Sequence, residues 1–147
     1  MIRIADKKEY PLLTAIWGRA VRATHDFLPE ENLQALKPLV RDCYLPAIAP
    51  YVWLNSAGEP QGFIGVAEGK IEMLFIDPDY CGQGVGTALI AFARQTLAAD
   101  SVDVNEQNHR AVAFYLSRGF TLCGRSELDG EGNPFPLLHM RCPSADC

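Results

Sequence analysis

The sequence predicts a mixed α/β fold in a single domain, with elements in the order β-αα-βββ-α-β-α-β. Short apolar runs typical of strands, beginning with Ile2–Ile4, alternate with stretches in which apolar residues recur every three or four positions. Three strand-like runs follow one another between residues 51 and 76, which argues against a strictly alternating doubly wound fold. The chain has 147 residues, without a repeat or linker. We therefore expect one domain over residues 1–147, with helices on both faces of a mixed sheet.

Two helices are expected after the first strand. Asp6 is a candidate N-cap, and Glu9 follows at the spacing of a capping box. Apolar residues between Leu12 and Val21 then fall on one face of a helix. A second helix should begin at Pro29, because proline suits a first helical position, and Pro38 should kink or split it.

The middle of the chain predicts three consecutive strands. They are Tyr51–Asn55, Gln61–Ala67 and Ile71–Ile76. Segments of turn composition, Ser56–Glu59 and Glu68–Lys70, separate them.

The last part of the chain alternates helices and strands. We expect a helix at about Val85–Ala98, a strand at Ser101–Val104 and a helix at about Asn108–Arg118. Two terminal strands, at about Thr121–Leu128 and Pro136–Arg141, flank a loop rich in glycine, asparagine and proline.

Composition narrows the possible partners. The formal net charge is −5 and there is no lysine or arginine run, which disfavours nucleic-acid binding and suits an amine-bearing partner. No apolar run approaches the roughly 20 residues of a membrane-spanning helix, and the N-terminus does not resemble a signal peptide. We therefore expect a cytoplasmic protein that does not bind membranes. The five cysteines form no C-x-x-C pair, so no metal is expected.

A glycine-rich loop lies between the third middle strand and the following helix. Gly82, Gly84 and Gly86 occupy alternate positions. Such a loop exposes backbone N–H groups at a helix N-terminus, where they favour an anion such as a diphosphate. A P-loop would need lysine before Thr87, and a dinucleotide-binding loop would need G-x-G-x-x-G, so both of these readings are weak. A purely structural turn remains an alternative.

A second motif follows the strand at Ser101–Val104. Residues Asn108 to Phe120 spell N-x-x-A-x-x-F-Y-x-x-x-G-F. Together with the glycine loop, this segment resembles the GNAT N-acetyltransferase superfamily over nearly the whole chain. Ala23–Leu28 and Gly124–Asp129 further resemble a small, largely uncharacterised enterobacterial-type branch. The resemblance implies that strands Ile71–Ile76 and Ser101–Val104 run parallel and splay apart, with the pantetheine arm of acetyl-CoA in the gap.

The resemblance also implies a set of cofactor-binding residues. Main-chain groups of the third middle strand would bind pantetheine, loop amides would bind the diphosphate, and residues around the second motif would complete the site. These residues are Leu74, Phe75, Ile76, Gly82, Gln83, Gly84, Val85, Gly86, Thr87, Asn105, Asn108, Phe114 and Tyr115. One position departs from the family pattern, because Cys81 stands where Arg or Gln is usual. A side-chain donor to the diphosphate is thereby lost, and Gln83 is a candidate replacement.

Three residues are candidate catalytic groups. The family position of Tyr115 lies near the CoA sulfur, which suggests a general acid, although a helix tyrosine can also pack in a core. Glu72 is the first candidate base; strand alternation predicts it on the opposite face from Met73, where it could equally be a surface residue. His25, beside Asp26 after the first helix, is the second candidate base or a helix cap.

These features predict an acetyl-CoA-dependent N-acetyltransferase that transfers an acetyl group directly to a primary amine in a ternary complex. The acceptor would be an amine-bearing small molecule or peptide, and a homodimer is possible in this family. The alternative is an acyl-CoA-binding regulatory module with little or no catalysis, which the unusual Cys81 and the lack of a clear base motivate. A nucleotide-binding protein is a third, weaker interpretation.

Overall fold

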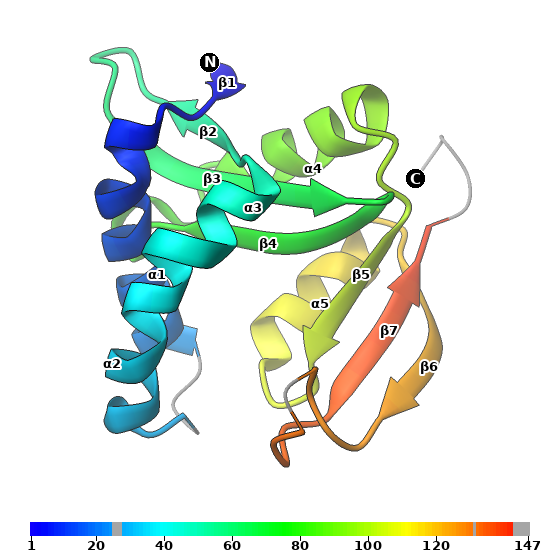
Figure 1. Ribbon diagram of the computed structural model, residues 1–147. Coiled ribbons are helices and arrows are strands. Elements are labelled where there is room, and N and C mark those ends of the chain that lie inside the picture. The colour runs from blue at the N-terminus through cyan, green and yellow to red at the C-terminus, as the bar shows by residue number, and fades with distance from the viewer. Residues whose placement is uncertain (25–27, 131, 143–147) are drawn as a thin grey trace.

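The computed structural model describes residues 1–24, 28–130 and 132–142. They form a seven-stranded sheet in the order β1-β2-β3-β4-β5-β7-β6 (Figure 1). Within it, β4 and β5 are parallel and the other neighbouring strands are antiparallel. The strands are β1 (Ile2–Ile4), β2 (Tyr51–Leu54), β3 (Pro60–Ala67), β4 (Lys70–Ile76), β5 (Ser101–Asn105), β6 (Thr121–Ser126) and β7 (Leu137–Arg141). The predicted mixed α/β class is therefore confirmed.

Helices cover both faces of this sheet. Those near the N-terminus pack on one face, and those of the second half lie behind it in Figure 1. The helices are α1 (Tyr10–Thr24), α2 (Glu30–Leu39), α3 (Leu45–Ile48), α4 (Val85–Thr96) and α5 (His109–Ser117). Three short turns complete the set, namely the 3-10 turns η1 (Lys7–Glu9) and η3 (Pro78–Tyr80) and the π-helical turn η2 (Val40–Tyr44).

Two cores lie on opposite sides of the central strands. Because side chains alternate along β3, Phe63 belongs to the core under α1, α2 and α3, and Ile64 belongs to the core under α4 and α5. Both side chains are fully buried. The first helical segment begins as predicted, since Asp6 and Glu9 form a capping box at η1, directly before α1.

A β-bulge interrupts β4 at Glu72. Val66 of β3 pairs with Ile71, but Gly65 pairs with Met73, so Glu72 is an extra residue on β4. The bulge overturns the alternation expected from the sequence, because Glu72 and Met73 line the same cavity under α1, α2 and η2. Beyond the bulge, the strand's alternation is shifted by one residue.

The strands β4 and β5 separate soon after they meet. Their pairing, within the described residues, consists of Lys70 with Ser101 and Ile71 with Val102. From the bulge onward they diverge, as Figure 1 shows. The parallel, splayed pair implied by the family resemblance is therefore confirmed.

The remaining differences from the sequence predictions concern the connections. Pro29 is the N-cap of α2, not its first residue, and Pro38 lies inside α2 one residue before its end. The helix then widens into η2 and continues as α3, so the predicted break follows the proline. β7 lies between β5 and β6, an order the sequence did not predict. Among the described residues, no helix has both the length and the apolar character of a membrane span.

Candidate active site

The loop between β4 and α4 has the geometry of an anion cradle. Gly82 and Gly84 have φ angles of 80° and 85°, a region that glycine adopts without strain. No atom lies within 4 Å of a Cβ built at either position, so a side chain there would project into open space beside the backbone. Because α4 begins at Val85, the loop amides and the helix dipole act at one place.

An ion pair holds the base of this loop. Arg19 of α1 donates a 2.5 Å hydrogen bond to Asp77, which is 5% exposed and follows β4 directly. Asp77 also accepts a bond from the Asp79 N–H. Burial acts to raise the pKa of Asp77, but the bonds from Arg19 and Asp79 outweigh it and the pKa is lowered. The loop is therefore tied to α1 by an ionised carboxylate.

A cleft of about 320 Å³ runs from this loop to the middle of α5. Most of the predicted cofactor-binding residues line it. They are Leu74, Phe75 and Ile76 from β4, Gly82, Gly84, Val85, Gly86 and Thr87 from the loop and α4, and Asn108, Phe114 and Tyr115 from α5. Gln83 is exposed and is not among the lining residues. We call this the donor cleft.

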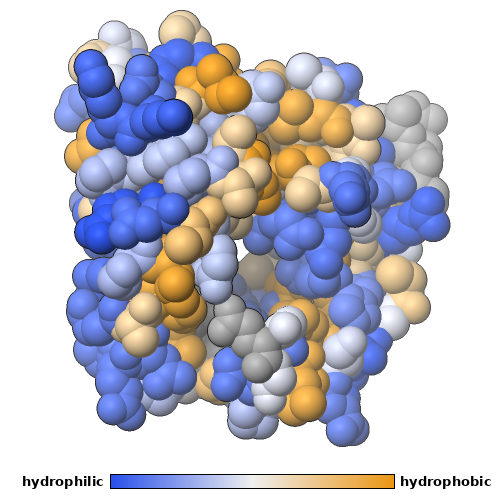
Figure 2. Space-filling view, in the orientation of Figure 1, coloured by the Kyte–Doolittle hydropathy of each residue, from blue (hydrophilic) through white to orange (hydrophobic). Residues whose placement is uncertain are grey.

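A larger cleft of about 910 Å³ opens where β4 and β5 separate. Residues of α2 and of the connection between β6 and β7 form its other walls. Figure 2 shows a hollow near the centre of this face of the molecule. The residues shared by the two clefts are Leu74, Phe75, Asn108, Ala111 and Tyr115. We call the larger cavity the acceptor cleft.

Tyr115 stands at the junction of the two clefts. Its side chain is 6% exposed and packs edge-on against Phe114 and Phe120. The described residues offer no hydrogen-bond partner to its hydroxyl, and burial raises the pKa of Tyr115 above its ordinary value. The phenol is therefore neutral and free to donate a hydrogen bond into either cleft.

Two asparagines flank the start of α5. Asn108 is the N-cap, and its side chain accepts a 3.2 Å bond from the Ala111 N–H. Asn105 ends β5 and lines the acceptor cleft. Its buried Oδ1 has no partner among the described residues, and such an atom is costly to leave unsatisfied unless a ligand or water donates to it.

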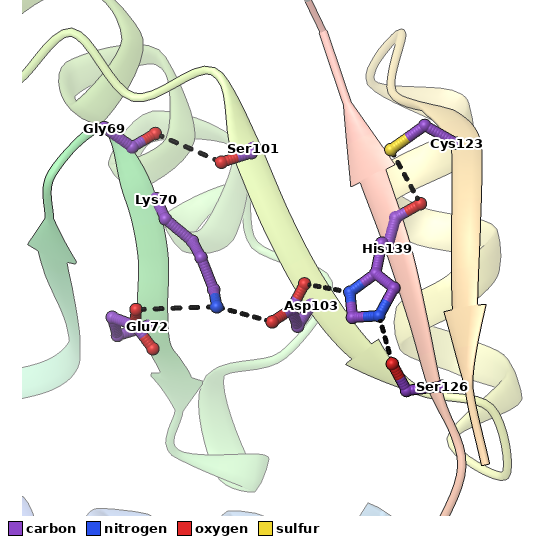
Figure 3. Close-up of polar contacts among 8 residues, drawn as sticks. All are labelled: Gly69, Lys70, Glu72, Ser101, Asp103, Cys123, Ser126 and His139. Atoms are coloured by element: carbon purple, nitrogen blue, oxygen red, sulfur yellow. Dashed lines mark hydrogen bonds and ion pairs between the residues drawn. The ribbon is translucent and has the colours of Figure 1, made fainter. Parts of the chain in front are cut away.

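Glu72 belongs to a polar network that crosses four strands, drawn in Figure 3. Lys70 lies 3.7 Å from Glu72 and 2.5 Å from Asp103. Asp103 also contacts Nδ1 of His139 at 2.6 Å, and Nε2 of His139 lies 2.6 Å from the Ser126 hydroxyl. Glu72 is 41% exposed, so its carboxylate is accessible from the acceptor cleft that it lines.

The charges at the centre of this network reinforce one another. The hydrogen bond to Asp103 raises the pKa of Lys70. Burial acts to raise the pKa of Asp103, but the bonds from Lys70 and His139 outweigh it, and the pKa falls below its usual value. Lys70 and Asp103 are therefore both charged at neutral pH and tie β4 to β5 where the strands separate.

The described residues fit the acyl-CoA that the family resemblance implies. The glycine loop provides amides for a diphosphate, and beyond the bulge β4 has an edge toward β5 without ladder partners in the described chain. Such an edge can pair with amide groups as an added strand does. The second candidate base, His25, lies outside the described residues. No cluster suited to hold a metal ion occurs in the part of the chain described.

Several residues of the site were not found from the sequence. Lys70 and Asp103 line the acceptor cleft, and Arg110 lines the donor cleft. Lys70 falls in a predicted turn, and Asp103 is the polar residue of an alternating strand, so neither has a distinctive local pattern. The sequence did carry a signal for Arg110, because the helix dipole disfavours a cation in the first turn of a helix, and such a residue is a candidate for a role other than stability.

Comparison with known proteins identifies the family. The model of the acetyltransferase (GNAT) domain matches residues 46–143. The chain is 42% identical over 142 residues to the peptidyl-lysine N-acetyltransferase YjaB of Salmonella typhimurium strain LT2, covering 97% of both chains. It is 43% identical over 139 residues to the protein of the same name from Escherichia coli strain K12, covering 95% of this chain and 94% of the relative.

Solved structures agree with this comparison. The solution structure of apo-form YjaB from Escherichia coli has a TM-score of 0.88 at 42% identity, covering 98% of this chain and 97% of that one. The fold is shared with a PaiA N-acetyltransferase from Thermoplasma acidophilum solved with coenzyme A, at a TM-score of 0.73, 15% identity, and coverage of 97% and 98%. The chain therefore belongs to the GNAT family of acetyl-CoA-dependent N-acetyltransferases.

Proposed function

We propose that this enzyme transfers the acetyl group of acetyl-CoA directly to the ε-amino group of a lysine in a peptide or protein. The observation that carries the proposal is the junction of the two clefts at Tyr115. Direct transfer needs both substrates bound at once with their reacting atoms in contact, and two clefts that share lining residues meet this need. The names of the two YjaB relatives support peptidyl lysine as the acceptor.

The donor cleft would hold acetyl-CoA along its length. Amides of Gly82, Gly84 and Gly86 would bind the diphosphate, and the free edge of β4 would bind the pantetheine amides. When bound, acetyl-CoA supplies the thioester carbonyl carbon that the amine attacks. The chain contributes positioning, which can account for roughly 7–11 kcal/mol of a barrier at its upper end.

Proton handling would fall to Glu72 and Tyr115. A lysine ammonium must lose two protons in all: one passes to solvent to give the neutral amine, and the second leaves as the nitrogen–carbon bond forms. Glu72 can accept this second proton directly or through a water. The carbon–sulfur bond then breaks, and Tyr115 can donate a hydrogen bond or a proton to the departing sulfur. Burial disfavours the Tyr115 phenolate, but it also disfavours a thiolate in the same place, so the proton transfer stays close to balanced.

The acceptor cleft suits a cationic side chain on a larger molecule. It is open to solvent at the surface seen in Figure 2. Glu31 and Asp129 lie on its walls in addition to Glu72 and Asp103, whereas Lys70 is its basic residue within the described chain. This excess of carboxylates would attract the ammonium form of lysine before deprotonation.

The experiment that tests the proposal measures CoA release from acetyl-CoA with a peptide that contains one lysine. A matched peptide with arginine in its place is the control. Tyr115→Phe should lower turnover by about 10²–10⁴-fold, because it removes the proposed acid, while acetyl-CoA binding measured by calorimetry is retained. Unchanged turnover would remove Tyr115 from the mechanism. Equal release with both peptides would exclude lysine as the acceptor, and acetyl-CoA binding without release from either would leave an acyl-CoA-binding module.

A further inference from the structure

Among the described residues that line the donor cleft, Arg110 is the one with a charged side chain. The other described lining residues are apolar, glycine, or uncharged polar groups such as Thr24, Thr87 and Asn108. A diphosphate brought into this cleft therefore meets a single cation and no carboxylate within the described lining. Because a guanidinium forms charge-assisted and often bidentate hydrogen bonds with phosphate oxygens, the diphosphate is a clear candidate partner for this cation.

The guanidinium of Arg110 is not engaged elsewhere. Most other arginines that form hydrogen bonds or ion pairs within the described chain have carboxylate partners, as in Arg22 with Glu30 and Arg125 with Glu106. Arg110 is exposed and has no hydrogen bond or ion pair with any residue in the described part of the chain. It is therefore available to a ligand.

The position of Arg110 also carries no structural benefit. Asn108 caps α5, so Arg110 is the second residue of the helix, where the positive end of the dipole disfavours a cation. A residue that breaks a local rule without a compensating contact is a candidate for function.

The packing of α4 against α5 brings Arg110 to the glycine loop. Phe114 lies one turn after Arg110 on the same helix face. Its Cζ is 3.3 Å from a Cβ built at Gly86, so the first turn of α4 fits closely against Phe114. Arg110 thus stands across the cleft from the amides of the loop.

The loop itself lacks a side-chain donor in the cleft. Cys81 occupies the position where the family usually has Arg or Gln, and its thiol lies 3.8 Å from the Asp77 carbonyl oxygen. Gln83, the replacement expected from the sequence, is not among the residues that line the cleft.

We propose that Arg110 binds the diphosphate of acetyl-CoA from α5, in place of the side-chain donor that the loop has lost. The loop amides bind the diphosphate from one wall, and the guanidinium binds it from the other with geometry suited to phosphate oxygens. This inference rests on the proposed function, since it assumes that acetyl-CoA occupies the donor cleft.

Calorimetry with three proteins, one rescue variant and two ligands tests it. The proteins are the wild type, Arg110→Gln and the control Lys8→Gln, which removes the same charge from an exposed site outside the cleft. The ligands are acetyl-CoA and its 3′-dephospho derivative, which keeps the diphosphate. Arg110→Gln should weaken both ligands by about tenfold, the effect of losing one charge-assisted contact, and Arg110→Lys should restore part of the loss. Lys8→Gln should bind both as the wild type does.

The melting temperature separates a ligand contact from a structural role. Arg110→Gln should melt at or slightly above the wild-type temperature, because it removes an unfavourable dipole interaction. A lower melting temperature with weakened binding would overturn the inference, as would wild-type affinity for both ligands. Weaker binding of acetyl-CoA with unchanged binding of the 3′-dephospho derivative would assign Arg110 to the 3′-phosphate and overturn the diphosphate assignment. If the wild type bound no acetyl-CoA, the proposed function would fail first.

Discussion

Lys70 is the residue that joins the two halves of the acceptor cleft. Its ammonium contacts Asp103 on β5 and lies near Glu72 at the bulge of β4. Lys70 and Asp103 are partly exposed, at 36% and 23%, so water screens part of their attraction. Lys70→Met should therefore lower the free energy of unfolding at pH 7 by only about 1 kcal/mol. Urea denaturation measures this change, and Lys7→Met, at an exposed lysine outside the network, is its control.

The pH dependence of this effect has a definite sign. The folded-state pKa of Asp103 is lowered, so its contribution is complete above the ordinary aspartate pKa of about 4 and is lost as pH falls through the lowered value. The raised pKa of Lys70 keeps that residue charged up to at least about pH 10. The difference between wild type and Lys70→Met should be constant from about pH 7 to 9 and shrink below pH 4. A difference that grew in acid would contradict the ion pair.

At the scale of elements, the sequence predicted what local signals determine. Strands bounded by turn residues and helices with clear caps lie within one or two residues of their expected positions, as Asn108 at the start of α5 illustrates. The bulge at Glu72 has no glycine or proline on β4 itself to mark it, and it places Glu72 and Met73 on one face where alternation predicts opposite faces. The insertion of β7 between β5 and β6 depends on pairing between distant segments, which no local pattern encodes.

The residues of the candidate site also fall into those that local sequence signals predicted and those that depend on packing between distant segments. Glycines of the loop were predicted because a required backbone conformation restricts the residue type. The cleft-facing positions of Arg110 and Lys70 could not be predicted, because they follow from how α5 packs on α4 and from where β4 and β5 separate.

The loop before α4 allows a test that separates backbone strain from ligand contact. Gly84 and Gly58 have φ angles of 85° and 79°, and neither has an atom within 4 Å of an added Cβ. Each alanine variant should therefore lower the free energy of unfolding by a similar amount, about 1–2 kcal/mol. Gly84→Ala should also weaken acetyl-CoA binding at least about tenfold, because its methyl group enters the cradle, whereas Gly58→Ala, in the turn between β2 and β3, should bind normally. Urea denaturation measures the change in the free energy of unfolding, and calorimetry measures the affinity for acetyl-CoA. Equal affinity in the two variants would exclude a role for the loop before α4 in binding the diphosphate.

At the scale of the whole molecule, two cores depend on one set of central strands. Phe63 and Ile64 are neighbours in β3 but belong to different cores. If the central strands came apart, the residues of both cores would be exposed to water together. The short pairing of β4 with β5 leaves the second half of the sheet attached mainly through the core that includes Ile71 and Val102. We therefore expect the chain to unfold as one domain, despite the cleft that divides its surface.

Matched truncations in the two cores test this expectation. Leu13 of α1 and Leu89 of α4 are both 0% exposed, one in each core. Leu13→Ala and Leu89→Ala should each lower the free energy of unfolding by about 2–5 kcal/mol. In both variants the fluorescence of Trp17 and Trp53, which pack against different cores, should change in the same single transition as the far-ultraviolet circular dichroism. If Leu13→Ala produced an early fluorescence transition while half of the helical signal persisted, the two sides of the sheet would be separate folding units, and the single-domain expectation would be wrong.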